Sequence, residues 1–135
     1  MKSRKIPIIY WIVTIFFALS MLFDGIAGVL RVDAGKIALA ILSFPEYLLT
    51  ILGTAKILGS IAIIQPTFRT IKEWAYAGFA FTFIGGFAAH AFTGDGFGML
   101  IPPVIMLVVM FVSYFLWRNF IIIVILEGLL FNRSK

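Results

Sequence analysis

Long runs of apolar residues, separated by short polar segments, dominate the sequence. Four of these runs are long enough to span a bilayer, because a helix needs roughly 20 mostly apolar residues to cross the hydrocarbon core. The four runs cover residues 6–30, 45–64, 71–92 and 101–117. The pattern predicts an all-α integral membrane protein, a bundle of four transmembrane helices within a single domain over residues 1–135.

The segment after the fourth run, residues 118–135, is too apolar for water, although it follows Arg118 and Asn119, which are expected at the membrane surface. A straight helix from Pro102 to Phe131 would be roughly 45 Å long, which exceeds the thickness of a bilayer core. Either this helix tilts and overshoots the membrane, or the tail bends to lie in the interface or against another subunit. We expect the second arrangement, an apolar interfacial tail.

The composition supports a membrane environment. Apolar residues make up 62% of the chain and charged residues 13%, with a mean hydropathy of +1.10, whereas soluble domains are about 45–50% apolar and about 25% charged. The net charge is +5. Most basic residues flank the apolar runs, however, and they form no basic stripe among exposed aromatic residues. The expected partner is therefore the lipid bilayer, and no nucleic-acid partner is expected.

Lysine and arginine are distributed unevenly between the two sides of the predicted bundle. With the N-terminus inside, the inner segments hold eight of these residues and the outer loops hold two. The inner residues are Lys2, Arg4, Lys5, Arg69, Lys72, Arg118, Arg133 and Lys135, and the outer ones are Arg31 and Lys36. Because cytoplasmic loops are enriched in Lys and Arg, both termini are predicted to face the cytoplasm.

Cysteine is absent, and His90 is the single histidine. Without cysteine this chain cannot form disulfides, perform thiol redox chemistry or ligate an iron–sulfur cluster. One histidine also excludes a bis-histidine haem within one subunit. No metal cluster, phosphate loop or nucleophilic triad is visible, so no metal site is predicted, and the sequence argues against an enzyme that works alone.

Lys56 is the most informative polar residue, because it falls near the middle of the second apolar run and an ionisable side chain is costly in hydrocarbon. At 100° per residue, Glu46, Thr50, Gly53, Lys56 and Ser60 share about a third of the helix circumference. This polar stripe is predicted to face the bundle interior. Lys56 is then either a cationic anchor for a quinone carbonyl, a carboxylate or a phosphate, or a structural residue that pairs with Asp24 or extends toward Glu46.

Asp24 interrupts the first apolar run about 9 Å from its outer end, at a depth near that of Lys56. A buried ion pair between Asp24 and Lys56 is therefore expected. Such a pair either contributes to a binding site or only fixes the register of two helices.

The third apolar run holds four further residues of interest. Glu73 and Trp74 lie in its first turn, where a carboxylate is stabilised by the helix dipole and an aromatic ring anchors the interface. His90 lies near the other end, with Tyr76 on the face that joins it to Glu73. Because an imidazole exchanges protons near neutral pH, His90 either passes protons, hydrogen-bonds a head group or packs as a satisfied polar residue.

Small residues are expected to allow close contact between helices, because they let backbones approach one another within lipid. They are Gly53, Gly59, Gly78, Gly85, Gly86, Ala88 and Ala89.

Three stretches carry a resemblance to a known family. Residues 53–59 read Gly-Thr-Ala-Lys-Ile-Leu-Gly, residues 72–79 read Lys-Glu-Trp-Ala-Tyr-Ala-Gly-Phe, and Ala-Ala-His at residues 88–90 precedes Gly-Asp at residues 94–95. They resemble the Gly-x-x-Lys-Leu-Leu-Gly, Lys-Glu-Trp-Ala-Tyr-Ala-Gly-Phe and Ser-His with Gly-Asp patterns of the DoxX-like family of small four-helix bacterial membrane proteins. The resemblance covers roughly residues 8–117.

The chain departs from the family pattern at two positions. Ala89 stands where the family usually has serine, and the lysine that such proteins often carry near the position of Gly28 is missing, with Asp24 the nearest charged residue. The family name derives from a membrane subunit associated with a quinone-linked oxidoreductase. The resemblance therefore implies a location in the bacterial plasma membrane and a partner that supplies the redox centre.

Three functions are compatible with these observations. The first is a membrane subunit or scaffold that binds a quinone-like or lipidic ligand among Asp24, Lys56, Tyr76 and His90, and supports a redox-enzyme subunit without a covalently bound cofactor of its own. The second is a small proton-coupled transporter or lipid-handling protein, which would act as a homo-oligomer because four helices are few for alternating access. The third is a purely structural membrane protein whose ion pairs fix the bundle.

Overall fold

The structure, a computed structural model, describes residues 2–135, with side chains from residue 5 onward, and is helical throughout, with no strand in this range. Its elements are α1 (Lys2–Val29), α2 (Asp33–Ile41), α3 (Tyr47–Ile64), α4 (Arg69–Thr93) and α5 (Phe97–Arg133). Four of them are long and apolar enough to cross a membrane, namely Lys5–Val29, Tyr47–Ile64, Arg69–Thr93 and Phe97–Arg133. The predicted all-α membrane class and its four spans are confirmed.

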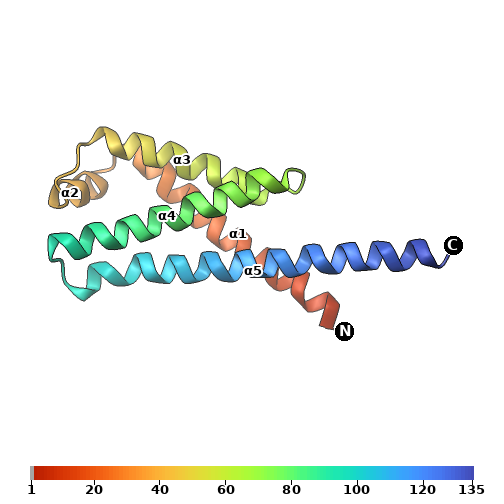
Figure 1. Cartoon of the computed structure of the whole chain (residues 1–135). Helices are drawn as coiled ribbons and strands as arrows, with labels where there is room; N and C mark the ends of the chain where they lie inside the picture. The colour runs from red at the N-terminus through yellow and green to blue at the C-terminus, as the bar shows by residue number, and fades with distance from the viewer. Residues whose placement is uncertain (1) are drawn as a thin grey trace.

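The four long helices form an elongated bundle in which α1 crosses obliquely behind α4 and α5 (Figure 1). Both chain termini and the loop between α3 and α4 lie toward one end of the bundle, whereas α2 and the loop between α4 and α5 lie at the other. An even number of spans places the termini on the same side of a membrane. The assignment of that side to the cytoplasm stays a prediction based on the Lys and Arg counts.

Helix α2 was not predicted from the sequence, which suggested only a loop between the first two spans. Its nine residues are too few to cross a bilayer. Asp33 lies in its first turn, where the helix dipole favours a carboxylate, and Leu39 packs into the protein on its inner side. The helix therefore forms a short amphipathic cover over the end of α1 and α3, at the side of the bundle away from the termini.

Close packing of α1 against α3 depends on glycine. A methyl group on Gly53 would lie 2.6 Å from the carbonyl oxygen of Gly25, and a methyl group on Gly28 would lie 3.0 Å from the carbonyl oxygen of Leu49. These are backbone atoms that cannot rotate away, so any larger residue at Gly53 would push the helices apart. The predicted role of Gly53 in helix contact is confirmed.

The other glycines divide into two groups. Gly59 lies under the ring of Phe79, where a methyl group would come within 2.8 Å, so its predicted packing role is also confirmed. Gly78, Gly85 and Gly86 have no atom within 4 Å of such a methyl group, and the expectation that they mediate helix contact is wrong. These three residues instead leave open space along α4.

Aromatic side chains and a set of hydroxyls join α1, α4 and α5. Phe17 lies edge-on to Phe79, with ring centroids 5.2 Å apart. The buried hydroxyl of Ser113 forms hydrogen bonds with Thr14 at 2.8 Å and with Tyr76 at 2.7 Å. Because hydrocarbon offers no alternative partners, these hydroxyls satisfy one another and fix the register of three helices.

Helix α5 continues without a break to Arg133, which corrects the expected helix end near Trp117 and the expected bend in residues 118–135. Its 37 residues give a length of about 55 Å, well above the roughly 30 Å of a bilayer core. Arg118 pairs with Glu73 at 3.0 Å, and the ring of Phe120 stacks on Tyr10 at 5.4 Å. These contacts hold the helix at the point where it was expected to turn, and its last turns project beyond the bundle (Figure 1).

Candidate functional site

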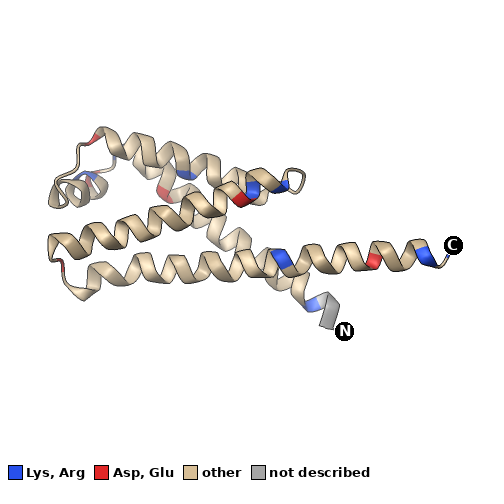
Figure 2. Ribbon diagram, viewed as in Figure 1, with Lys and Arg blue, Asp and Glu red and all other residues tan. Residues whose placement is uncertain are grey.

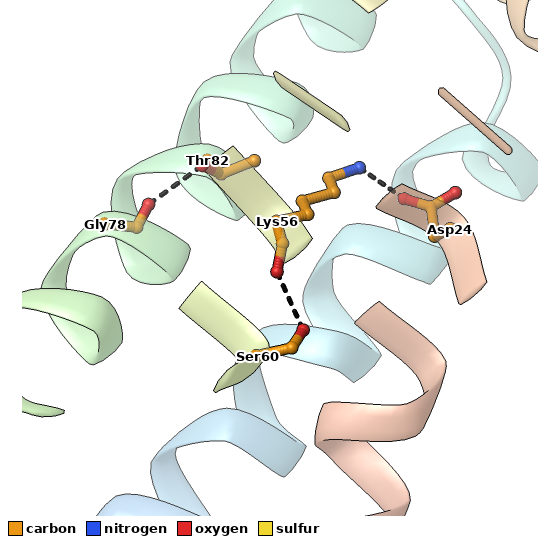
Figure 3. A network of polar contacts seen from close by, with 5 residues as sticks. All are labelled: Asp24, Lys56, Ser60, Gly78 and Thr82. Carbon is orange, nitrogen blue, oxygen red and sulfur yellow. Dashed lines mark hydrogen bonds and ion pairs between the residues drawn. The ribbon is translucent and has the colours of Figure 1, made fainter. Parts of the chain in front are cut away.

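The central feature of the bundle is an ion pair between Lys56 on α3 and Asp24 on α1 (Figure 3). The ammonium group of Lys56 donates a hydrogen bond to the Asp24 carboxylate. The glycine contact explains why the two meet: Gly53 lies one turn before Lys56, and Gly25 follows Asp24 directly. The expected pairing of Asp24 with Lys56 is confirmed, but its expected burial is not, because the Asp24 side chain is more than half exposed.

The pair is not sealed within the protein. The side chain of Lys56 is 22% exposed and that of Asp24 is 54% exposed, so the carboxylate opens to the outside of the bundle. Figure 2 shows that most other charges lie near the ends of the helices. A charge exposed along an apolar span is costly unless water, a second protein or a polar ligand group meets it.

The polar stripe on α3 was predicted to face the bundle interior, and its residues Gly53 and Lys56 contact α1. Gly53 and Ser60 are buried, and the hydroxyl of Ser60 donates to the carbonyl oxygen of Lys56 at 2.7 Å. Thr50 accepts a hydrogen bond from Arg31 at 3.1 Å. Glu46 differs, because it is exposed at the N-terminal end of α3 and makes no capping hydrogen bond. No contact joins it to Lys56 among the ion pairs of the described side chains.

Three hollows adjoin Lys56. The largest, about 510 Å³, lies between α4 and the helices α2 and α3, and its lining includes Lys56, His90 and Pro103. A second, about 430 Å³, is lined by Lys56, Thr82 and Trp74, and a third, about 300 Å³, contains Asp24 beneath α2. These are sizes typical of small-molecule sites, which usually range from about 300 to 1,000 Å³.

The largest hollow, hereafter the Lys56–His90 groove, owes its width to small residues on α4. Gly85, Gly86 and Ala89 line it, and neither glycine has a neighbouring atom where a side chain would begin. The opposite wall is apolar and comes from α2 and α3, with Leu39, Leu48 and Leu52 among its residues. The groove therefore combines an apolar body with two ionisable groups, Lys56 and His90.

His90 is held by a carboxylate that sequence reasoning did not assign to the site. Its Nδ1 atom lies 2.7 Å from Oδ2 of Asp95, and both side chains are largely buried. Gly94 makes this possible, because its left-handed conformation at φ 79° ends α4 and turns the chain so that the Asp95 N–H donates to the carbonyl of His90. The signal in the sequence was the Gly-Asp pair shortly after the histidine.

Tyr76 does not join the other three candidates. It lies buried among α1, α4 and α5, bonded to Ser113 and stacked on Trp117 with ring centroids 5.8 Å apart. It lines none of the three hollows around Lys56. The expectation that Tyr76 shares a pocket with Lys56 is therefore wrong, because the face of α4 that carries Tyr76 is turned toward α5.

Glu73 and Trp74 lie at the start of α4. The Glu73 carboxylate accepts a hydrogen bond from Arg118, and both side chains are about half exposed. Trp74 is 73% exposed and lines the second hollow with Lys56. Glu73 thus joins α4 to α5, while Trp74 lies on the outer surface of the bundle, where aromatic residues anchor proteins at membrane interfaces.

Sequence reasoning missed Lys72, which it placed among the basic residues of the inner loops. Lys72 is only 4% exposed, lies within α4 and donates a hydrogen bond to the Tyr10 hydroxyl. The missed signal was helical spacing: Lys72, Tyr76, Phe79 and Phe83 follow one another by four, three and four residues, and all four are buried. Among the side chains of residues 5–135, no group of His, Asp and Glu lies close enough together to hold a metal ion.

Fold and site together define a small polytopic membrane protein with an apolar groove that is lined by two ionisable side chains, Lys56 and His90. The sequence matches the family model of the DoxX-like family over residues 12–112, and the chain belongs to this family. No curated protein and no solved structure matches it. The family match covers α1 from residue 12 onward, α2 to α4 and α5 as far as residue 112, so the extended end of α5 lies beyond it.

Proposed function

We propose that this protein is a membrane subunit or scaffold that binds a quinone-like or lipidic molecule in the Lys56–His90 groove. It would support an oxidoreductase whose redox centre is supplied by another subunit in the bacterial plasma membrane. The observation that supports this most directly is the position of Lys56, which lines all three adjoining hollows from the middle of α3.

Each ionisable group then has a distinct role. The Lys56 ammonium donates a hydrogen bond to a carbonyl or head-group oxygen, a contact that gains strength in a medium of low dielectric constant. Asp24 balances the lysine charge while the groove is empty. His90, oriented by Asp95, exchanges a proton with the polar end of the ligand, since a hydrogen bond to one ring nitrogen fixes the role of the other. The apolar walls hold the ring or chain of the ligand.

Organic extraction of the purified protein, followed by mass spectrometry of quinones and lipids, tests this proposal. Lys56→Met removes the charge with little change in length, whereas Thr54→Val changes an exposed residue of the same helix that lines no hollow around Lys56. We expect a near-stoichiometric molecule in the wild type and in Thr54→Val, and about tenfold less in Lys56→Met, which corresponds to about 1.4 kcal/mol of lost binding. Equal amounts in all three samples would contradict the proposal.

One observation favours a second candidate function, a proton-coupled transporter. The Asp24 carboxylate is 54% exposed along a membrane span, which is also the place for a proton-binding group on a transport route. Uptake of a solute into proteoliposomes would support transport if it required a pH gradient and were lost in Asp24→Asn. Uptake that is absent in the wild type would leave ligand binding as the better account.

A further inference from the structure

Lys72 is buried, and no carboxylate among the side chains of residues 5–135 pairs with it. Its side chain is 4% exposed and donates to the Tyr10 hydroxyl, and its ammonium lies 5.2 Å from the ring centre of Tyr10 and 5.3 Å from that of Trp117. None of the three ion pairs among the side chains of residues 5–135 includes it. Aromatic rings offset part of the cost of burying this charge, but they supply no counter-charge.

A small cavity of about 170 Å³ opens beside Lys72 and brings a second cation to the same place. Arg69 also lines it and lies three residues earlier on α4, so both side chains project from one face of the helix. They belong to the first turn of α4, where the helix dipole adds partial positive charge. The electrostatic character of the cavity therefore favours an anion.

The position of the cavity indicates what kind of anion it would hold. It is lined by Phe68 and Arg69, where α4 begins, and the loop before α4 lies toward the end of the bundle that contains the termini (Figure 1). Its lining residues Lys72 and Trp117 directly precede Glu73 and Arg118, which form an exposed ion pair. Exposed charges of this kind mark the head-group region of a membrane. The remaining wall is apolar and is built by Phe120, Ile121 and Val124 of the extended α5.

We propose that this cavity binds the phosphate group of an anionic membrane lipid. Arg69 and Lys72 contact the phosphate oxygens, Trp11 and Trp117 flank the glycerol region, and an acyl chain lies along Phe120 and Val124. A volume of about 170 Å³ suits a head-group phosphate and not a whole lipid. Basic pockets between transmembrane helices are known to bind lipid head groups in this way.

This lipid site is separate from the Lys56–His90 groove. The two cavities share no lining residue. The lipid site also gives the extension of α5 a role, because Phe120, Ile121 and Val124 lie beyond the region that matches the family. A substitution that abolishes binding in one cavity can therefore be distinguished from one that abolishes binding in the other.

Native mass spectrometry of the full chain in detergent, with added lipid, tests the proposal. The probes are phosphatidylglycerol, zwitterionic phosphatidylethanolamine and inorganic phosphate. Arg69→Gln removes an exposed cation, so the bundle is expected to fold, and Lys72→Met removes the buried one. Arg133→Gln removes an exposed cation at the far end of α5 and serves as the matched control.

We expect phosphatidylglycerol to bind about tenfold more tightly than phosphatidylethanolamine, and this preference to fall to near unity in Arg69→Gln and Lys72→Met but not in Arg133→Gln. Competition by millimolar inorganic phosphate would support the phosphate site while assigning it to a soluble anion. Equal binding of both lipids by the wild type, or an unchanged preference in Arg69→Gln, would overturn the proposal.

Discussion

Gly53 on α3 and Gly25 on α1 touch through their backbones, so that a methyl group on Gly53 would lie 2.6 Å from the Gly25 carbonyl oxygen. This contact sets the distance between two helices and so determines whether the Lys56 ammonium reaches the Asp24 carboxylate one turn away. The ion pair, and with it the charge beside the three hollows, thus depends on two residues that carry no side chain.

Gly53→Ala is therefore expected to destabilise the protein by about 1–3 kcal/mol, the usual cost of overpacking a closely packed contact. Thermal unfolding in detergent measures the change. Gly78→Ala is the control, since nothing lies within 4 Å of the added methyl group, and a helical alanine is favoured over glycine by about 0.5–1 kcal/mol. Equal stability of the two variants would show that the close contact has no energetic consequence.

Removing one partner of the Asp24–Lys56 ion pair should lower the stability of the protein more than removing both partners. Asp24→Asn leaves the Lys56 ammonium without its partner, with an expected loss of about 3 kcal/mol, the cost of a lone charge at the centre of a span. The double variant Asp24→Asn with Lys56→Met removes both charges and should recover most of that loss. If the double variant were less stable than Asp24→Asn alone, Lys56 would be stabilised by something other than Asp24.

The hydroxyls of Thr14, Ser113 and Tyr76 should contribute measurably to the bundle. Ser113→Ala removes the group that bonds to both of the others, and we expect a loss of about 1 kcal/mol in the free energy of unfolding. Thr82→Ala removes only a bond to the carbonyl of Gly78 within the same helix and should change stability by less than half as much. Steric trapping or denaturant unfolding in mixed micelles would compare the two.

Asp95 should act on the groove through His90. Asp95→Asn keeps the size of the side chain but weakens its hold on the imidazole, so ligand retention should fall severalfold while thermal stability changes little. The exposed Asp33→Asn on α2 gives a matched control. If Asp95→Asn retained as much ligand as the control, the proposed role of His90 in proton exchange would be contradicted.

The sequence predicted the four spans well because hydropathy over some 20 residues is a strong signal. It also predicted that Lys56 faces the interior and pairs with Asp24, since lipid leaves few other places for a charge. It could not give the rotation of α4 about its own axis, which turns Tyr76 toward Ser113 and away from Lys56. The charge at Arg118 suggested a helix end, whereas the backbone meets no proline there and continues to Arg133.

The most direct test of the central claim is to fill the Lys56–His90 groove. Gly86→Leu places a side chain where the structure leaves space, and Gly128→Leu makes the same change on α5, away from the groove, also with no atom within 4 Å. Bound quinone or lipid would be quantified by mass spectrometry in both folded variants. The account predicts that Gly86→Leu loses the molecule and Gly128→Leu keeps it at the wild-type level; retention in Gly86→Leu would contradict it.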